Sequence, residues 1–385
     1  MDRNYLQKLR PERLPSPCFV VDEAKLAENA ATLDSVQQRT GAKILLALKG
    51  FATFSTFPVL NEILHGTCAS SPHEARLGRE EFGGEVHSFA AAYSDDDMAE
   101  LIQYSDHIVF NSFTQLRKYR PFIQAAERDI KIGVRVNPQH SEGAVPIYDP
   151  CSPGSRLGVR LEHFDENDLE GVSGLHFHTL CEQDADALDR TLEAVEKQFG
   201  HILHNMEWLN FGGGHHITRE DYDLDRLCAC IERAQSRYGV QVYLEPGEAI
   251  ALNAGILVAT VLDIIQADMD IAILDASAAC HMPDVLEMPY RPFVIDSDTK
   301  DTKAHSYRFA GKSCLAGDVI GEYSFDAPLS VGDRLAFTDM AIYSMVKTNT
   351  FNGLQLPAIA RYNPNSGELH IVREFGYEDF KSRLS

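Results

Sequence analysis

The chain has 385 residues, 44% hydrophobic and 24% charged, which is enough for one large domain and a smaller one. Its formal net charge of −22 argues against nucleic acid as a partner, because binding phosphates requires a basic surface. The sequence has no apolar run long enough for a membrane span, and its polar N-terminus lacks the apolar core of a signal peptide. An acidic surface is compatible with plain solubility or with attraction of a polycationic small molecule.

The eight cysteines are too scattered for a disulfide framework, and no pair has the spacing of a zinc site. We therefore expect a reduced, cytoplasmic protein without a structural metal.

From residue 43 to residue 246, short apolar runs alternate with longer stretches, most of them helix-like. The runs are KILLAL (43–48), GTCAS (66–70), VHSFAAA (86–92), HIVFNS (107–112), IGVRVN (132–137), GLHFH (174–178), EWLNF (207–211) and VYLEP (242–246). Apolar rather than alternating strands are typical of a parallel sheet that is buried on both faces. Eight such units predict a (β/α)8 TIM barrel.

The stretches between these runs have features of helices. In 184–199, apolar residues recur at spacings of three and four. In 71–82 and 94–105, Ser71 and Ser94 each precede an acidic residue by three positions, which predicts an N-cap. The fifth unit differs because a long loop follows Asn137, and loops of that length are often functional.

After about residue 255, strand-like runs follow one another without helices, which predicts a C-terminal antiparallel β domain. The early run CFVVD (18–22) precedes the barrel and is expected to pair with this domain. The predicted domains are therefore a barrel over 23–254 and a β-sandwich or β-barrel domain formed by 1–22 and 255–385.

Polar residues end many of the barrel strands, and in a TIM barrel such residues surround the active site. They are Lys49, Ser70 or Ser71, Arg135, Asn137, His178, Asn210 with the glycines 212–214, and Glu245. Taken singly each has a plainer interpretation: a strand-end lysine often extends to solvent, a lone histidine often lies in a core, and three glycines can form a tight turn.

Together these residues favour a pyridoxal 5'-phosphate site. A buried lysine with a lowered pKa forms imines readily, glycine N–H groups can approach a phosphate, and a carboxylate such as Glu245 can keep a pyridine nitrogen protonated. His178 could stack on the cofactor ring.

The sequence resembles the barrel-type (fold-type III, alanine racemase-like) pyridoxal-phosphate basic amino acid decarboxylases, which include ornithine and diaminopimelate decarboxylases. The matching stretches span nearly the whole chain: ALKGF (47–51), CAS (68–70), GVR (133–135), SRLG (155–158), FH (177–178), NFGGG (210–214), EPGE (245–248), GKSCLAGD (311–318), AIY (341–343) and TFNG (350–353). The chain length, LCEQ after His178 and 275–292 are most similar to the carboxynorspermidine/carboxyspermidine decarboxylases of polyamine synthesis.

The resemblance implies a role for each matching barrel residue. Lys49 would bind the cofactor covalently, His178 would stack on its ring, and Glu245 would face the ring nitrogen. Arg135 would lie behind the cofactor and orient Glu245. Gly213 and Gly214, together with Tyr343 of the β domain, would contact the phosphate.

The resemblance also implies a homodimer with shared active sites. In this family the loop that carries Cys314 and Asp318 reaches the partner's site, where the cysteine donates a proton after carbon dioxide leaves. The substrate's distal amines require carboxylates, for which Asp318, Asp275, Asp149 and Glu248 are the candidates. Asp149 could equally be an exposed turn acid before Pro150. His281 could touch substrate or only cap a loop.

Three departures from the family pattern bear on the phosphate and the substrate. Glu248 stands where relatives commonly have arginine, so either it points elsewhere or another cation compensates. Leu180–Cys181 replaces a glycine–serine pair, which removes a phosphate hydroxyl. Leu315 replaces the acid that binds the distal end of ornithine or diaminopimelate, which favours a longer amine.

The predicted activity is therefore decarboxylation of carboxynorspermidine or carboxyspermidine. The alternatives are decarboxylation of diaminopimelate, ornithine or arginine, racemisation, an inactive regulatory relative, and a cofactor-free Schiff-base aldolase. Leu315 argues against ornithine and diaminopimelate. The joint presence of Lys49, His178, Glu245 and Cys314 argues against an inactive relative.

Overall fold

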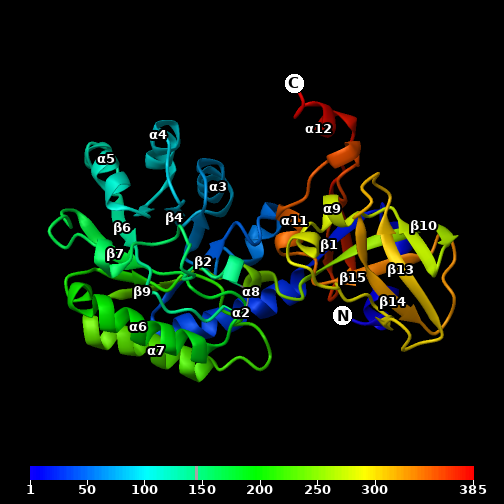
Figure 1. The fold of residues 1–385 in the computed structure, drawn as a ribbon, viewed down its shortest axis with the longest axis horizontal. Coiled ribbons are helices and arrows are strands. Elements are labelled where there is room, and N and C mark those ends of the chain that lie inside the picture. Colours follow the sequence, from blue (N-terminus) through cyan, green and yellow to red (C-terminus); the bar gives the residue numbers. More distant parts are fainter. Residues whose placement is uncertain (144–145) are drawn as a thin grey trace. The chain divides into compact units, whose positions relative to one another are not determined.

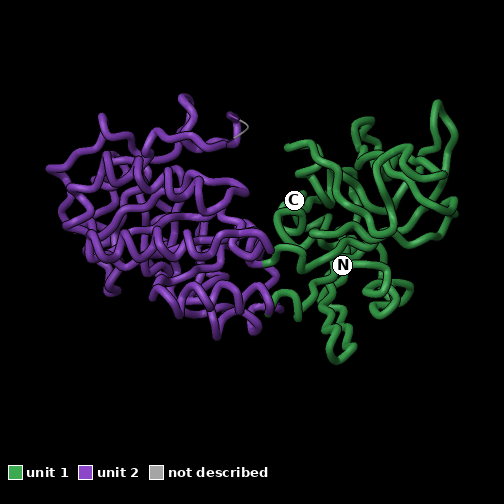
Figure 2. The backbone as a smooth tube through the Cα atoms, turned by 90° about the horizontal axis from the view of Figure 1, so that it is seen from below, with its two compact units in different colours: residues 1–27, 251–385 green, residues 28–250 purple. Residues whose placement is uncertain are grey.

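The eight apolar runs form a closed barrel of eight parallel strands, as predicted. The computed structural model describes residues 1–143 and 146–385. It divides into two compact units, 28–250 and 1–27 with 251–385 (Figure 2). The barrel strands are β2 (Lys43–Ala47), β3 (Gly66–Ala69), β4 (Glu85–Phe89), β5 (His107–Phe110), β6 (Lys131–Arg135), β7 (Val172–His176), β8 (Trp208–Asn210) and β9 (Gln241–Leu244). Each strand pairs with the next, and β9 pairs with β2.

Helices connect most of these strands and lie outside them (Figure 1). They are α3 (Pro72–Leu77), α4 (Asp95–Tyr104), α5 (Phe113–Gln124), α6 (Ala185–Leu203) and α7 (Leu224–Tyr238). The helix α2 (Glu23–Thr40) precedes the first barrel strand, and α8 (Glu248–Ala251) follows the last. The predicted caps are present: Ser71 accepts from the Glu74 N–H, and Ser94 forms a capping box with Asp97. Two connections differ from a regular unit, since β2 and β3 are joined through the 3₁₀ helix η2 (Phe54–Val59), and the long loop after β6 holds the 3₁₀ turns η4 (Pro146–Tyr148) and η5 (Leu161–His163). The π-helical turn η3 (Gly78–Phe82) continues α3.

The other unit contains a nine-stranded sheet that includes the N-terminal strand, as expected. Its strands are β1 (Cys18–Asp22), β10 (Gly255–Gln266), β11 (Asp270–Leu274), β12 (Asp298–Thr299), β13 (His305–Gly311), β14 (Val319–Phe325), β15 (Arg334–Thr338), β16 (Ala358–Asn363) and β17 (Glu368–Arg373). The order is β12-β14-β13-β11-β10-β1-β16-β17, with β15 also paired to β10. Short helices complete the unit: α1 (Arg3–Leu9), η1 (Pro11–Arg13), α9 (Ala278–His281), α10 (Asp284–Glu287), α11 (Tyr343–Val346), η6 (Phe351–Gly353) and α12 (Tyr377–Lys381).

This sheet is mixed rather than wholly antiparallel. Most neighbours are antiparallel, but β1 runs parallel to β16 and β11 runs parallel to β13. Parallel neighbours require a crossover connection, and the segment between β11 and β13, which contains α9 and α10, provides one. Consecutive residues of β1 face two cores: Phe19 packs in one, and Cys18 and Val20 pack in the other.

Among the helices that the structure describes, none is both long enough and apolar enough to span a bilayer.

Candidate active site

Lys49 lies in the turn directly after β2 and is partly buried. Burial lowers the pKa of its ammonium group. The Cys68 thiol and the Glu245 carboxylate oppose this shift, while the Arg135 guanidinium adds to it. A lysine with a lowered pKa has a larger neutral fraction at pH 7, and the neutral amine is the form that attacks an aldehyde.

Glu245 follows β9 directly and is 6% exposed. Burial by itself would raise the pKa of its carboxyl group, but His176 and the Asn210 amide outweigh burial and lower the pKa to about 2. The Asn210 Nδ2 donates to Oε1 at 2.7 Å, and the His176 Nε2 lies 3.3 Å from Oε2. Glu245 is therefore an anion at neutral pH, as required of a group that holds a proton on a pyridine nitrogen.

Arg135 and His178 lie beside each other in the barrel. Arg135 ends β6, and its Nη2 donates to the His178 carbonyl oxygen at 2.7 Å. The guanidinium carbon lies 4.6 Å from the centre of the Phe89 ring. Burial, with the charges of Lys49 and Arg135, holds the pKa of His178 well below its usual range, and its Nδ1 accepts from the Gly213 N–H at 3.3 Å. The ring is thus neutral, which suits stacking on another ring.

The glycines after β8 form a cradle that a side chain would fill. A Cβ atom on Gly213 would lie 2.3 Å from the Glu245 carbonyl oxygen, and one on Gly214 would lie 2.0 Å from the Leu180 carbonyl oxygen. Gly214 also has a φ of +84°, in the region that favours glycine. Both ring nitrogens of the neighbouring His215 and His216 are buried without a hydrogen-bond partner among the described residues. A glycine cradle of this kind allows the close approach of a phosphate group.

Glu248, at the position where the family resemblance predicts an arginine, lies beside a histidine. The His216 Nε2 lies 3.6 Å from the Glu248 Oε1. Burial opposes a charge on His216, but Glu248 and then Glu182 raise its pKa above the ordinary value. A protonated His216 would offset the negative charge of Glu248, so the pair would reduce the repulsion between Glu248 and a phosphate. His216 and His176 were not among the predicted residues; His176 could have been found from the strand alternation, two positions before His178.

The other predicted site residues belong to the sheet unit. Cys314 is exposed in the connection between β13 and β14, and Tyr343 begins α11. Asp275 is 6% exposed, and its Oδ1 accepts from the Thr260 N–H at 2.8 Å. Asp318 is 2% exposed, and both of its oxygens accept hydrogen bonds.

His281 is fully buried, and both of its ring nitrogens have partners. Nδ1 accepts from the Ser277 N–H at 3.2 Å, and Nε2 donates to the Gln355 carbonyl at 3.1 Å. Burial lowers the pKa of His281 to about 4, so the ring is neutral. These contacts favour the loop-capping interpretation of His281 over a contact with substrate.

Asp149 is 5% exposed, so it is not the exposed turn acid considered above. Its Oδ1 accepts from the Cys151 N–H at 2.7 Å within the long loop. Asp149, Asp275 and Asp318 are thus buried carboxylates with hydrogen bonds to nearby backbone, and a role of any of them in substrate binding stays a prediction.

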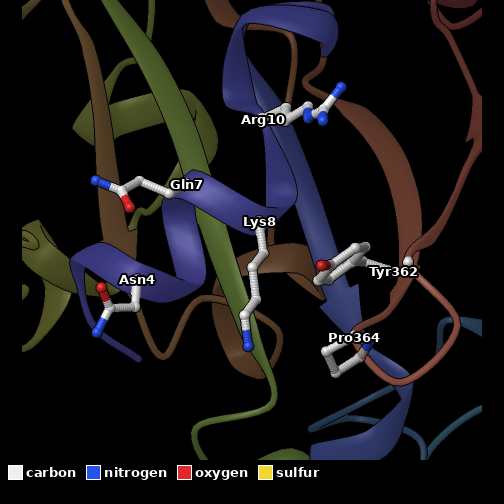
Figure 3. Close-up of a pocket in the computed structure, with 7 residues that line it drawn as sticks. Asn4, Gln7, Lys8, Arg10, Tyr362 and Pro364 are labelled. Atoms are coloured by element: carbon white, nitrogen blue, oxygen red, sulfur yellow. The ribbon is translucent and has the colours of Figure 1, made fainter.

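The sheet unit also has a surface pocket. It has a volume of about 690 Å³ and lies between α1 and the turn after β16 (Figure 3). Lys8, Arg10, Tyr362 and Pro364 are among its lining residues, and no predicted site residue is.

Comparison with known proteins identifies the family of this site. The family "Pyridoxal-dependent decarboxylase, C-terminal sheet domain" matches residues 18–341. The chain belongs to this family of pyridoxal-dependent decarboxylases. It is 46% identical to the carboxyaminopropylagmatine decarboxylase of Synechocystis sp., over 99% of this chain and 98% of the relative.

Two further matches come from Campylobacter jejuni. The chain is 41% identical to the carboxynorspermidine/carboxyspermidine decarboxylase of that organism, over 97% of this chain and 99% of the relative. The crystal structure of C. jejuni carboxynorspermidine decarboxylase complexed with norspermidine is 40% identical, covers 96% of this chain and 100% of its own, and gives a TM-score of 0.89. The chain is therefore a decarboxylase with pyridoxal phosphate as its cofactor, and the residues described above fit that group.

Proposed function

We propose that this decarboxylase acts on a carboxylated polyamine, carboxynorspermidine or carboxyspermidine, and releases norspermidine or spermidine. The observation that carries this proposal is the similarity over nearly the full length to a decarboxylase whose crystal structure holds norspermidine. Leu315, 43% exposed in the loop of Cys314, supports it, because the family resemblance leads us to expect an acid at this position in an ornithine or diaminopimelate decarboxylase.

The residues of the barrel suit the roles proposed for them. Lys49 would hold the cofactor through its nitrogen, and Gly213 and Gly214, with His216, would hold its phosphate. Glu245 would keep a proton on the ring nitrogen. Arg135 would lie behind the cofactor and help to orient Glu245. When bound, pyridoxal phosphate supplies the electron sink for the bond that breaks as carbon dioxide leaves.

After carbon dioxide leaves, the α-carbon needs a proton. We assign this proton to the Cys314 thiol, with the loop contributed by a partner chain in a homodimer, and Tyr343 of that unit would contact the phosphate. Cys314 is exposed, which suits donation of this proton into the active site of a partner chain. All eight cysteines are free, which supports a reducing cytoplasmic location.

A second substrate is favoured by a specific observation: a relative that is 46% identical acts on carboxyaminopropylagmatine. That compound ends in a guanidinium group, where the polyamines end in a primary amine. Both ends are cationic, so either compound requires a carboxylate for its distal end, and the predicted candidates in the barrel unit are Asp149 and Glu248.

The test offers five compounds to the purified, cofactor-loaded protein and measures carbon dioxide release. The compounds are carboxynorspermidine, carboxyspermidine, carboxyaminopropylagmatine, ornithine and diaminopimelate. We expect the highest kcat/KM for one or both carboxylated polyamines, with a difference of one methylene worth about 1–3 kcal/mol. A higher kcat/KM for carboxyaminopropylagmatine would show that this compound is the substrate instead of a carboxylated polyamine. Reaction with ornithine or diaminopimelate alone would contradict both proposals.

A further inference from the structure

The carboxylate of Asp318 joins two separate segments of the sheet unit. Its Oδ1 accepts from the Ala278 N–H at 2.7 Å and from the Ala279 N–H at 3.3 Å, at the start of α9. Its Oδ2 accepts from the Ser277 hydroxyl at 2.8 Å and from the Ser313 hydroxyl at 2.5 Å. Ser313 directly precedes Cys314, so the carboxylate fastens the Cys314 loop to the first turn of α9.

A second set of hydrogen bonds connects Cys314 to α9, through Asn349 and Asn352. The Asn349 Nδ2 donates to the Ala279 carbonyl at 2.8 Å, and the Asn349 N–H donates to the Cys280 carbonyl at 2.9 Å. These bonds attach the segment that carries Asn352 to α9. The Asn352 Oδ1 in turn accepts from the Cys314 N–H at 2.9 Å. Cys314 is therefore fixed both through Ser313 and through Asn352, and both contacts depend on α9.

The surroundings of Asp318 leave no space for a ligand at its oxygens. The residue is 2% exposed, and a Cβ atom on Gly311 would lie 2.2 Å from Oδ2. A carboxylate with several hydrogen-bond donors would have to give up those bonds to bind a substrate amine, and leaving buried donors unpaired is costly. The loop itself is open, because Lys312 and the four residues from Cys314 to Gly317 are exposed.

We propose that Asp318 is a positioning residue that fixes the Cys314 loop to α9 and does not contact the substrate. This inference rests on the proposed function for the role of Cys314 as proton donor. We call the hydrogen bonds of Asp318 with Ser313 and α9 the Asp318 clamp. Together with the Asn352 contact, this clamp fixes the backbone at Cys314, while Cys314 itself lies in an exposed part of the loop. A proton donor that must reach one carbon atom gains from such a fixed backbone, because small misplacements of a catalytic group reduce the rate strongly.

The test compares Asp318→Asn, Ser313→Ala and Ser297→Ala in the cofactor-loaded full chain, by amide hydrogen exchange and by steady-state kinetics. Ser297→Ala is the control, because it removes a buried hydroxyl of the same unit that bonds to the Val294 carbonyl at 2.7 Å, away from the loop. We expect Asp318→Asn to speed exchange over 312–317 by about tenfold or more while β10 keeps its protection. We expect kcat to fall by about 10- to 100-fold with KM within about twofold of the wild-type value. Ser313→Ala should also speed exchange over 312–317 and lower kcat, but by less than Asp318→Asn. If Asp318→Asn does not fold, the result for Ser313→Ala tests the proposal.

Three outcomes would contradict the proposal that Asp318 is a positioning residue. Unchanged exchange over 312–317 would show that the loop does not depend on Asp318. A large rise in KM with kcat retained would make Asp318 a substrate contact. Loss of protection throughout the sheet unit would make the residue a general structural one. Cys314→Ala separates this inference from the proposed function: near-normal turnover in that variant would refute the proton-donor role, whereas the exchange pattern of Asp318→Asn would still report on the clamp.

Discussion

The ionised state of Glu245 makes a prediction about stability that can be worked out from the structure. Its pKa of about 2 lies below the ordinary value of 4.5, and the side chain is 6% exposed. A folded-state pKa that is depressed stabilises the fold above the ordinary pKa, and this contribution is lost as the pH falls toward the folded value. The difference corresponds to about 3 kcal/mol at pH 7.

The perturbation is Glu245→Gln, which keeps the shape of the side chain but cannot ionise. We expect this variant to be about 3 kcal/mol less stable than the wild type at pH 7, and about 2 kcal/mol of that gap should disappear between pH 5 and pH 3. Urea unfolding of both proteins at several pH values, with and without cofactor, measures the gap. Glu62→Gln, at an exposed position, is the control for the substitution itself.

A gap that stays constant from pH 7 to pH 3, or that widens as the pH falls, would contradict a depressed pKa for Glu245. In that case the contacts with Asn210 and His176 would not be holding Glu245 as an anion. The same variant should lose at least about 100-fold in kcat, because a neutral amide cannot keep the ring nitrogen protonated.

Three further predictions concern single residues. Lys49→Ala should abolish carbon dioxide release, and near-normal activity would contradict the mechanism. Gly214→Ala should weaken cofactor binding by at least about tenfold, seen in a fluorescence titration, because the new Cβ would meet the Leu180 carbonyl oxygen and the φ of +84° costs about 1–2 kcal/mol for a side chain; unchanged affinity would show that the cradle relaxes. Ser94→Ala should lower the free energy of unfolding by about 1 kcal/mol, through loss of the capping box of α4, without changing cofactor affinity; an unchanged midpoint in urea would show that this cap contributes little.

The barrel could be predicted from the sequence because its strands are continuous apolar runs with polar residues at their ends. Each of the eight runs became a strand within a few residues of its predicted bounds. The direction of pairing in the other sheet could not be predicted, because strand periodicity carries no information on whether neighbours are parallel.

The site was predictable only in part, and for a physical reason. The sequence indicates which carboxylates exist, but it does not indicate whether a carboxylate already accepts backbone hydrogen bonds. Asp149, Asp275 and Asp318 all do. The pairing of Glu248 with His216 was equally hidden, because the two residues follow different strands and meet only when the barrel closes.

The proposed roles of the barrel residues all depend on the attachment of the cofactor to Lys49. Treating the cofactor-loaded protein with borohydride, followed by proteolysis and peptide mass spectrometry, locates the lysine that carries the cofactor. The structure predicts that the reduced cofactor is found on the peptide containing Lys49, and that Lys49→Ala carries none. Label on another lysine in the wild type, or no label on a protein that binds the cofactor, would contradict the assignment.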